Sequence, residues 1–295
     1  MAIDKQVCTV ITGASQGLGK ALAEECAGRG RNLVLAALPG TGLPEVARWL
    51  ERAHGIRVEH LELDLTADDG PDQLARFVGD RGLAVEALLN NAGVGFNGRF
   101  GDSAPANNET TIRLNMLALV SLTRLLLSEL RRHERSHVLN VASLAAWFPM
   151  PWLPVYSSSK SFVLTFSLAL REELRGTGVS VSVLCPNGIR TNRSVRELID
   201  RQGLAGRLTC QYPDEVARAA MRGLLKGKAI IVPGRLNQFI RVASGLVPRT
   251  LSMGIISRRW NSQAPRVPRQ PRRLSAWLLA WRKAVTARLR PATTP

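Results

Sequence analysis

The chain has 295 residues, 45% of them hydrophobic, and a formal net charge of +17. This length suits one large α/β domain, and the apolar content is ample for its core. Four cysteines without metal-ligand or redox spacing exclude a metal-cluster or dithiol-redox protein and indicate thiols of a reducing cytosol. The first strand starts by about residue 6 and no apolar run looks long enough to span a bilayer, so we expect a cytoplasmic protein.

A strand, a glycine turn and a helix follow one another at the start of the chain. Residues 6–11 form a β-branched run, Thr12-Gly13-Ala14-Ser15-Gln16-Gly17-Leu18-Gly19 follows, and a helical pattern then runs to Gly28. Gly13 permits a tight turn, Gly17 lets backbone N–H groups approach a pyrophosphate, and Gly19 lets the helix pack closely on the strand. An ordinary strand-to-helix turn is the alternative interpretation.

Two more strand-like runs, residues 33–37 and 56–63, extend this pattern to a βαβαβ unit. The alternation predicts a doubly wound, Rossmann-type parallel sheet with helices on both faces, and we assign residues 1–235 to this domain. Ligands bind at the carboxyl ends of such strands, so we expect the pocket there.

A tyrosine and a lysine share one helical face in the middle of the chain. Tyr156 and Lys160 are four residues apart, and residues 161–174 are apolar at helical spacing. An adjacent positive charge favours phenolate and moves the tyrosine pKa toward neutrality, where acid–base catalysis is efficient. The alternative is a surface lysine beside a half-buried tyrosine.

Further motifs follow the glycine turn in a definite order. They are Asn90-Asn91-Ala92-Gly93, Asn115, Ser143 thirteen residues before Tyr156, and Pro186 with Thr191. In order and spacing, these motifs resemble the short-chain dehydrogenase/reductase family of the Ser-Tyr-Lys type, over about residues 5 to 235. The resemblance implies an NAD(P)-dependent oxidoreductase that transfers hydride between a nicotinamide cofactor and a carbonyl or secondary alcohol.

The resemblance also implies a role for each catalytic residue. Tyr156 is the general acid in ketone reduction and the base in alcohol oxidation, while Lys160 lowers its pKa and holds the nicotinamide ribose. Ser143 hydrogen-bonds the substrate carbonyl as negative charge develops there, and Asn115 anchors a water relay to Lys160. A strand-end hydroxyl for Ser143 and a polar-facing helical asparagine for Asn115 are the alternatives.

A cofactor site is implied by the same resemblance, with Asp64 at the adenine and Asn91 beside the cofactor. No metal ligand is expected. The implied cofactor-binding residues are Thr12, Gly13, Ser15, Gln16, Gly17, Leu18, Gly19, Leu38, Asp64, Leu65, Asn91, Ala92, Gly93, Tyr156, Lys160, Pro186, Ile189 and Thr191.

Two positions depart from the family pattern. Asn187 stands where the family commonly has glycine, and asparagine is the next most tolerant residue for positive φ. The second predicted strand ends Leu35-Ala36-Ala37-Leu38-Pro39, with neither an acid for the NAD ribose nor an arginine for the NADP phosphate. The absence of a repelling carboxylate favours NADP, and NAD remains open.

The positive charge is concentrated after the catalytic domain. Residues 1–215 contain 23 basic and 23 acidic side chains, whereas residues 216–295 contain 17 basic and none acidic. We assign 236–260 to an apolar helical segment, 261–273 to a Pro/Arg linker and 274–295 to a basic amphipathic tail. Such a tail fits a peripheral membrane anchor, and the alternatives are a helix folded on its own domain or a disordered basic tail.

The predicted substrate pocket is apolar with a cationic lid. Residues 144–153 should supply its floor, and residues 192–212 should form a lid with Arg193, Arg196, Arg201 and Arg207. This pattern favours an apolar carbonyl compound with an acidic end, such as a fatty-acyl derivative. The tail and Asn140-Val141-Ala142-Ser143 also resemble family members that handle acyl or steroid ketones. A cofactor-binding protein of the same fold without turnover is the alternative. We expect a homo-oligomer and no nucleic-acid partner, because the tail has few base-reading side chains.

Overall fold

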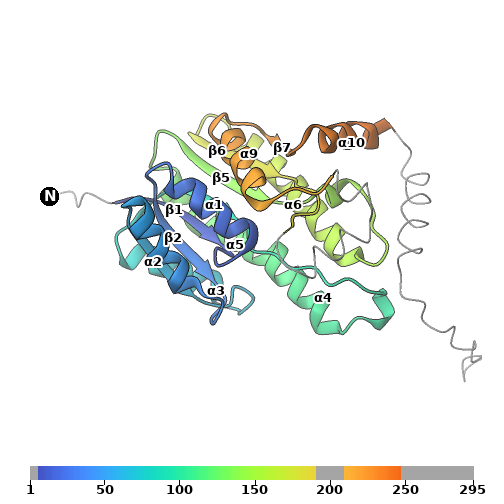
Figure 1. The fold of residues 1–295 in the computed structure, drawn as a ribbon, viewed down its shortest axis with the longest axis horizontal. Coiled ribbons are helices and arrows are strands. Elements are labelled where there is room, and N and C mark those ends of the chain that lie inside the picture. The colour runs from blue at the N-terminus through green and yellow to red at the C-terminus, as the bar shows by residue number, and fades with distance from the viewer. Residues whose placement is uncertain (1–5, 191–208, 247–295) are drawn as a thin grey trace, which may run out of the picture. The chain divides into compact units, whose positions relative to one another are not determined.

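A seven-stranded parallel sheet forms the centre of the protein, as a computed structural model shows for residues 6–190 and 209–246 (Figure 1). The strand order is β3-β2-β1-β4-β5-β6-β7, which is the doubly wound order that the sequence predicts. The strands are β1 (Val7–Thr12), β2 (Asn32–Ala37), β3 (Val58–Glu62), β4 (Ala84–Asn90), β5 (Ser136–Val141), β6 (Val179–Leu184) and β7 (Ile230–Ile231).

Helices connect the strands as crossovers, because neighbouring parallel strands cannot be joined by a tight hairpin. The α-helices are α1 (Gly17–Ala27), α2 (Leu43–His54), α3 (Gly70–Asp80), α4 (Pro105–Ile112), α5 (Leu119–Leu130), α6 (Pro154–Glu173), α9 (Pro213–Leu225) and α10 (Arg235–Leu246). Short 3₁₀ turns lie at η1 (Phe100–Asp102) and η3 (Leu144–Trp147), and η2 (Arg113–Ala118) is a π-helical segment.

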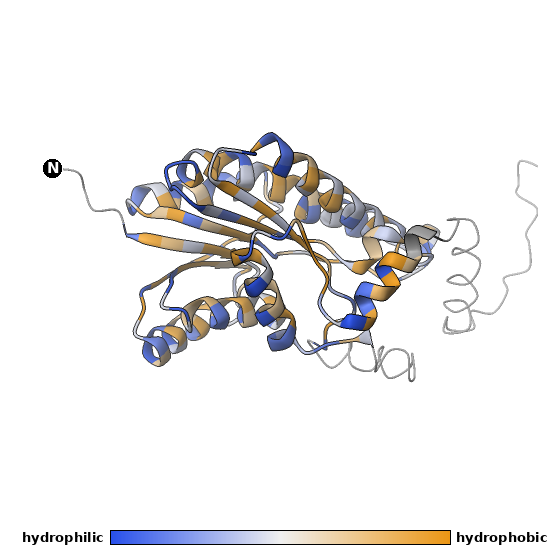
Figure 2. Ribbon diagram, turned by 90° about the horizontal axis from the view of Figure 1, so that it is seen from above, coloured by the Kyte–Doolittle hydropathy of each residue, from blue (hydrophilic) through white to orange (hydrophobic). Residues whose placement is uncertain are grey.

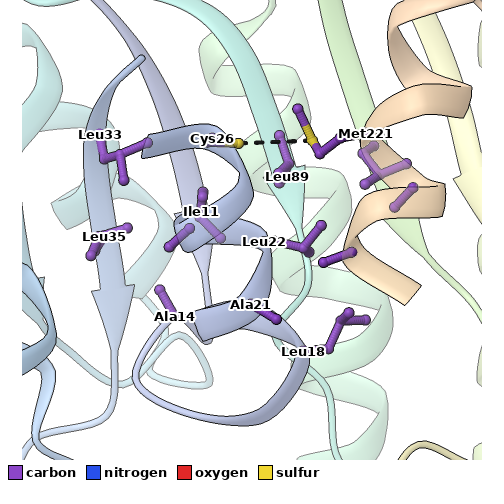
Figure 3. Close-up of a cluster of buried hydrophobic side chains, with 14 of the residues drawn as sticks. Ile11, Ala14, Leu18, Ala21, Leu22, Cys26, Leu33, Leu35, Leu89 and Met221 are labelled. Carbon is purple, nitrogen blue, oxygen red and sulfur yellow. Dashed lines mark hydrogen bonds between the residues drawn. The ribbon is translucent and has the colours of Figure 1, made fainter. Parts of the chain in front are cut away.

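Two apolar layers sandwich the sheet (Figure 2). Helices α1, α2 and α9 cover one face, where α1 packs between the strands and α9 and the Cys26 thiol lies 3.8 Å from the Met221 sulfur (Figure 3). Helices α3, α5 and the end of α6 cover the other face. Burial raises the pKa of both Cys8 and Cys26 to about 12, so these thiols behave as small apolar side chains.

The order of the strands changes direction at β1. The chain adds β2 and β3 on one side of β1 and then crosses over to β4 on the other side. β1 pairs with β2 on one side and with β4 on the other, so Ile11 is opposite both Leu35 and Leu89. The connections that leave β1 and β4 therefore diverge and open a crevice at the carboxyl ends of these strands. The sequence predicts the ligand site at this place.

One expectation about apolar runs is wrong. The continuous helical stretch Pro105–Leu130 is long and apolar enough, by length and composition, to cross a membrane. Its α5 part lies on the sheet, where Leu122, Leu126 and Leu130 are buried in the core. A core helix of a doubly wound fold is covered on one side by the sheet, so its composition resembles that of a membrane span.

The predicted boundaries of the C-terminal segments reach beyond the described residues. Contacts divide the chain into two units, Met1–Trp260 and Asn261–Pro295. Helix α10 covers the start of the predicted apolar segment, and the rest of that segment, the Pro/Arg linker and the basic tail lie outside the described residues.

Candidate functional site

The β1–α1 turn has no room for side chains. Gly13 and Gly17 have φ angles of +66° and +57°, a region that favours glycine. A Cβ at Gly19 would lie 2.0 Å from the Gly13 carbonyl oxygen and 2.5 Å from the Asn91 side-chain nitrogen, so the predicted close packing of helix and strand is confirmed.

The N-terminus of α1 is open to an anion. Gln16 precedes the helix in an extended conformation, its side chain does not cap the helix, and the first turn contains no acidic residue. The first N–H groups of a helix have no intrahelical partner and carry partial positive charge. With the close glycine backbone, this arrangement fits the pyrophosphate of a dinucleotide.

Thr12 and Asn91 join the ends of β1 and β4. The Thr12 hydroxyl accepts hydrogen bonds from the backbone nitrogens of Asn91 and Ala92, both at 3.0 Å. The Asn91 side chain donates to the carbonyls of Thr12 at 2.9 Å and Gly13 at 3.2 Å. Asn91 therefore fixes the crevice floor through its own side chain, a role that its sequence position alone did not indicate.

Three side chains with the predicted catalytic chemistry meet above β5. Tyr156 and Lys160 lie in the first turns of α6, and Ser143 lies two residues after the end of β5. The Ser143 hydroxyl is in hydrogen-bonding contact with Tyr156 and accepts a bond from the Ala145 nitrogen at 3.2 Å. The structure thus brings Ser143, Tyr156 and Lys160 together.

Lys160 is an almost completely buried cation. Its side chain is 4% exposed, its Nζ donates to the Val141 carbonyl at 2.8 Å, and that nitrogen lies 5.7 Å from the centre of the Tyr156 ring. Burial lowers the pKa of Lys160 to about 8, because desolvation disfavours the charged form. The group therefore exchanges its proton near neutral pH.

The pKa of Tyr156 differs from the sequence expectation. Burial raises this pKa above its ordinary value, and only the hydrogen bond with Ser143 acts in the opposite direction. We expected the lysine to lower it, but at this separation desolvation of the phenol is the larger effect. Tyr156 consequently holds its proton at neutral pH, which is the form that donates.

Asn115 lies in the π-helical segment and holds the backbone beside the catalytic pair. Its side chain accepts from the Val94 nitrogen and donates to the Val94 carbonyl, both at 2.9 Å, and also donates to the Ser159 hydroxyl at 2.9 Å. A Cβ at Gly93 would lie 3.1 Å from both Asn115 Oδ1 and Lys160 Nζ. Asn115 and Lys160 therefore flank the same glycine, and π-helical insertions are often found at functional sites.

A buried polar ladder ties together the elements that carry these residues. Asn90 on β4 donates to Thr123 on α5 and to Asn140 on β5, both at 2.9 Å. Asn140 in turn donates to Ser167 on α6 at 2.9 Å. Buried polar groups that are fully paired specify one arrangement of their elements, so the ladder fixes α6 relative to the sheet.

Two positioning features were missed in the sequence. Gly95 packs against the catalytic phenol, because a Cβ there would lie 2.5 Å from Tyr156 Cδ2. Trp152 has a φ of 71°, the one positive value outside glycine among the described residues, and its carbonyl accepts from the Gly98 nitrogen at 2.9 Å. The spacing Gly93-Val94-Gly95 was the available signal for the first feature, and the second had none.

At the predicted adenosine end of the crevice, a carboxylate comes from β3. The end of β2 carries none. Glu62 is opposite Ala37 in the sheet register, and its Oε1 accepts from the Gly40 nitrogen at 3.0 Å. Asp64 accepts from both the nitrogen and the hydroxyl of Thr66, at 2.8 and 2.7 Å. Leu38 is exposed here, as a residue at the adenosine end would be.

Several predicted cofactor contacts are limited to backbone atoms. The side chains of Leu18 and Leu65 belong to the two apolar layers and are buried, and Ser15 is nearly so. Ala92 packs against the same core. Their side chains face the interior, so we expect any cofactor contact from these residues to come from peptide groups.

The turn after β6 accommodates Asn187 without the positive φ we expected, since Trp152 alone has one among the described non-glycine residues. The Asn187 amide donates to Asn237 on α10 at 3.2 Å, and its oxygen accepts from the Gly188 nitrogen at 2.9 Å. The Pro186 carbonyl accepts from the Leu144 nitrogen at 2.8 Å, and Ile189 forms a bridge with Gln211. Thr191 and the predicted lid arginines lie outside the described residues.

The predicted floor, residues 144–153, does not line the small pocket beside Tyr156. The lining of the pocket is Phe96, Gly98, Phe100, Ser103, Asn108, Thr111, Pro154, Val155 and Tyr156. In the predicted floor, Leu144 and Ala145 are buried, and Trp147 and Phe148 pack against the core. The apolar wall therefore comes from Phe96, Phe100, Pro154 and Val155, and the floor expectation is wrong for this pocket.

Known proteins are similar to this chain in sequence and in fold. The family model described as short chain dehydrogenase matches residues 7–201. Human 17-beta-hydroxysteroid dehydrogenase type 3 is 36% identical over 185 residues, which cover 62% of this chain and 59% of that protein. Ketoacyl reductase HetN of Nostoc sp. is 30% identical over 249 residues, 84% of each chain. The match therefore spans about three fifths of the hydroxysteroid dehydrogenase, so its activity does not transfer directly.

A solved structure agrees with the fold over nearly the whole chain. The short-chain dehydrogenase of Sphingobium yanoikuyae in complex with NADPH has a TM-score of 0.68 at 26% sequence identity. The alignment covers 99% of this chain and 98% of that one.

We predict that Gly95→Ala lowers turnover by about 10²-fold, because the new methyl group must displace the Tyr156 ring and a shift of about 1 Å can cost that much. Gly101→Ala is the matched control, since a Cβ there meets nothing within 4 Å. Steady-state reduction of a ketone by both variants checks this, with thermal unfolding as a measure of folding. Equal turnover in the two variants would contradict the packing argument.

The buried lysine predicts a dependence of stability on pH. Below pH 8 the ammonium is charged in both states, whereas between about 8 and its ordinary value of 10.5 the folded protein releases the proton first. The unfolded state then binds more protons, so the free energy of unfolding rises with pH. Relative to Lys160→Met, the wild type should gain roughly 3 kcal/mol between pH 7 and pH 10.5. Urea unfolding measures this, and parallel pH profiles would exclude it.

Proposed function

The chain belongs to the short chain dehydrogenase family, and we propose that it transfers hydride between a nicotinamide cofactor and an apolar ketone or secondary alcohol. One observation carries the proposal: a buried cation, a protonated phenol and a hydroxyl meet at the carboxyl ends of the strands, beside a glycine turn that fits a pyrophosphate. The bound cofactor supplies or accepts the hydride.

The protein's own groups handle the proton and the developing charge. Tyr156 donates its proton to the carbonyl oxygen as the alcohol forms, and Ser143 hydrogen-bonds that oxygen while it gains negative charge. Lys160, with a pKa of about 8, returns a proton toward the phenol after each turnover. Asn115 holds the Val94 peptide, and with it the glycines that contact Lys160 and Tyr156.

The substrate class follows from the walls beside the phenol. Phe96, Phe100 and Val155 are apolar, and Asn108 and Thr111 add a few polar groups. A mostly apolar pocket with few polar contacts suits an apolar ketone. The two relatives named as a hydroxysteroid dehydrogenase and a ketoacyl reductase support an acyl- or steroid-like ketone. The four arginines between residues 192 and 212 in the sequence favour a substrate with an acidic end.

A binding protein of the same fold without turnover is the second candidate. A protein of that kind would have a catalytic group missing or misplaced. Here Ser143 contacts Tyr156, and the Lys160 nitrogen lies 5.7 Å from the centre of the Tyr156 ring. We therefore favour the enzyme.

For the cofactor we favour NADP. Ala37 and Leu38 offer no carboxylate against a 2′-phosphate, and the similar structure from Sphingobium yanoikuyae is a complex with NADPH. Glu62 on the neighbouring strand β3 opposes this preference in part. Its carboxylate accepts a hydrogen bond from the Gly40 nitrogen and so places a negative charge in the loop after β2. NAD is the alternative.

The charge and the free thiols of the chain support a proposal for its cellular compartment and its membrane association. We propose a cytoplasmic homo-oligomer, with residues 274–295 as a basic tail for peripheral membrane association. Residues 216–295 carry 17 basic and no acidic side chains, which suits an anionic lipid surface. Free cysteines at Cys8, Cys26, Cys185 and Cys210 agree with a reducing compartment.

We predict that Tyr156→Phe lowers ketone reduction by 10²–10⁴-fold, because no other group replaces the phenol proton. Binding of NADPH, followed by its fluorescence, should change little. Tyr212→Phe is the matched control, because Tyr212 is the other of the two tyrosines and is half-exposed on the surface. Retention of most activity in Tyr156→Phe would sink the catalytic assignment.

The cofactor preference predicts opposite effects of two substitutions. NADPH should bind more tightly than NADH, and Ala37→Asp should reverse that order by placing a carboxylate against the 2′-phosphate. Glu62→Gln should increase the NADPH preference, because it removes a negative charge at the adenosine end. Titrations of both nucleotides measure the ratios, and a wild type that prefers NADH would show that the assignment to NADP is wrong.

A further inference from the structure

Helix α10 is fastened to the domain along one face. Asn237 is buried, and its amide donates to the carbonyls of Thr209 and Pro233 at 3.0 and 3.1 Å. Ile240 packs on the core that contains Val163 and Val232. The Gln238 side chain donates to the Val232 carbonyl at 3.0 Å. The helix is thus held in place by paired polar groups and by packing.

Its outer face carries large apolar side chains. Leu236 is 43% exposed, Phe239 is 69% exposed and Val242 is 60% exposed. At about 100° per residue, these three positions fall within about a third of the helix circumference. Phe239 is the most exposed large apolar side chain among the described residues. Contiguous apolar side chains of this size on a surface mark an interaction site.

The charge around this face has one sign. Helix α10 contains Arg235 and Arg241 and no acidic residue, and Arg235 is exposed. From residue 216 to the end of the chain there are 17 basic side chains and no acidic ones. Arg241 lies against Trp147, so Arg235 is the exposed cation beside the apolar face. Such a face suits the interface of an anionic bilayer, where the apolar side chains enter the acyl boundary and Arg235 meets the headgroups.

The same helix contacts segments next to the catalytic residues. It packs against η3, the turn that begins directly after Ser143, and the Arg241 guanidinium lies 5.9 Å from the Trp147 ring centre. Asn237 also accepts from Asn187, in the turn that follows Pro186. A surface bound through α10 therefore lies next to the segments that follow Ser143 and Pro186.

We propose that the outer face of α10, formed by Leu236, Phe239 and Val242, docks on an anionic lipid bilayer and sets the catalytic site close to apolar ketones dissolved there. The docking rests on the folded domain, whereas its use for substrate delivery rests on the proposed function. A second copy of the chain is a poor occupant. Three side chains bury far less than the roughly 800 Å² per partner of a stable interface, and helix α10, which has no acidic residue, offers an identical helix no opposite charge.

Flotation of the full-length protein with vesicles tests the docking. Vesicles of phosphatidylcholine with about 30% phosphatidylglycerol are compared with phosphatidylcholine alone, for wild type and for Phe239→Ser/Val242→Ser. Leu225→Ser is the matched control, because Leu225 is 44% exposed at the end of α9. We expect wild type and Leu225→Ser to bind the anionic vesicles alike and the double variant to bind at least tenfold more weakly.

Two further measurements keep the outcomes distinct. If the double variant unfolds at a lower temperature, the single variant Phe239→Gln takes its place, with the same expected direction. Reduction of a water-soluble ketone should be unchanged in all these variants, and its absence in wild type would argue against the proposed function without affecting the vesicle result. Equal vesicle binding by wild type and the double variant overturns the docking, as does a wild-type dimer that the double variant converts to monomer.

Discussion

The site depends on the close packing of Gly13, Gly19 and Asn91 at the ends of β1 and β4. Gly19 touches the Gly13 carbonyl, and the Asn91 side chain fills the remaining space by bonding to the carbonyls of Thr12 and Gly13. No side chain larger than hydrogen fits there. Because β4 is fixed in this way, the chain that leaves it passes Gly93 beside Lys160 and Gly95 beside Tyr156. The nucleotide turn and the catalytic pair thus share one support.

The site places costly groups in the interior and compensates each with a partner. A buried ammonium is disfavoured by desolvation, and Lys160 offsets part of that cost through one carbonyl and a lowered pKa. The ladder from Asn90 to Ser167 buries amides and hydroxyls, but each is paired across an element boundary. Such networks fix elements relative to one another more than they add stability. The result is a phenol, a cation and a hydroxyl held in one geometry.

Local patterns in the sequence predicted much of the fold and of the catalytic site. The strand–glycine–helix order gave β1 and α1 within two residues of their ends, and the spacing of Tyr156 and Lys160 placed both on one face of α6. What could not be predicted depends on partners far apart in the chain. Asn187 meets Asn237 fifty residues later, and Glu62 reaches the loop after β2. The direction of the Tyr156 pKa shift depends on burial, which a spacing rule does not contain. The length of the apolar helix Pro105–Leu130 was also missed, because it is the structure that joins α4, η2 and α5 into one continuous helix.

The strand order also governs how the chain matures on the ribosome. β1 emerges early and pairs with β2 soon afterwards, but its other edge waits for Ala84–Asn90, more than seventy residues later. Pairing between such distant segments is slow because a long loop must close first. The nascent chain therefore exposes a hydrophobic central strand edge during synthesis, which is a form prone to aggregation. The same exposure recurs at β4, whose free edge waits for Ser136–Val141, and at β5, whose free edge waits for Val179–Leu184.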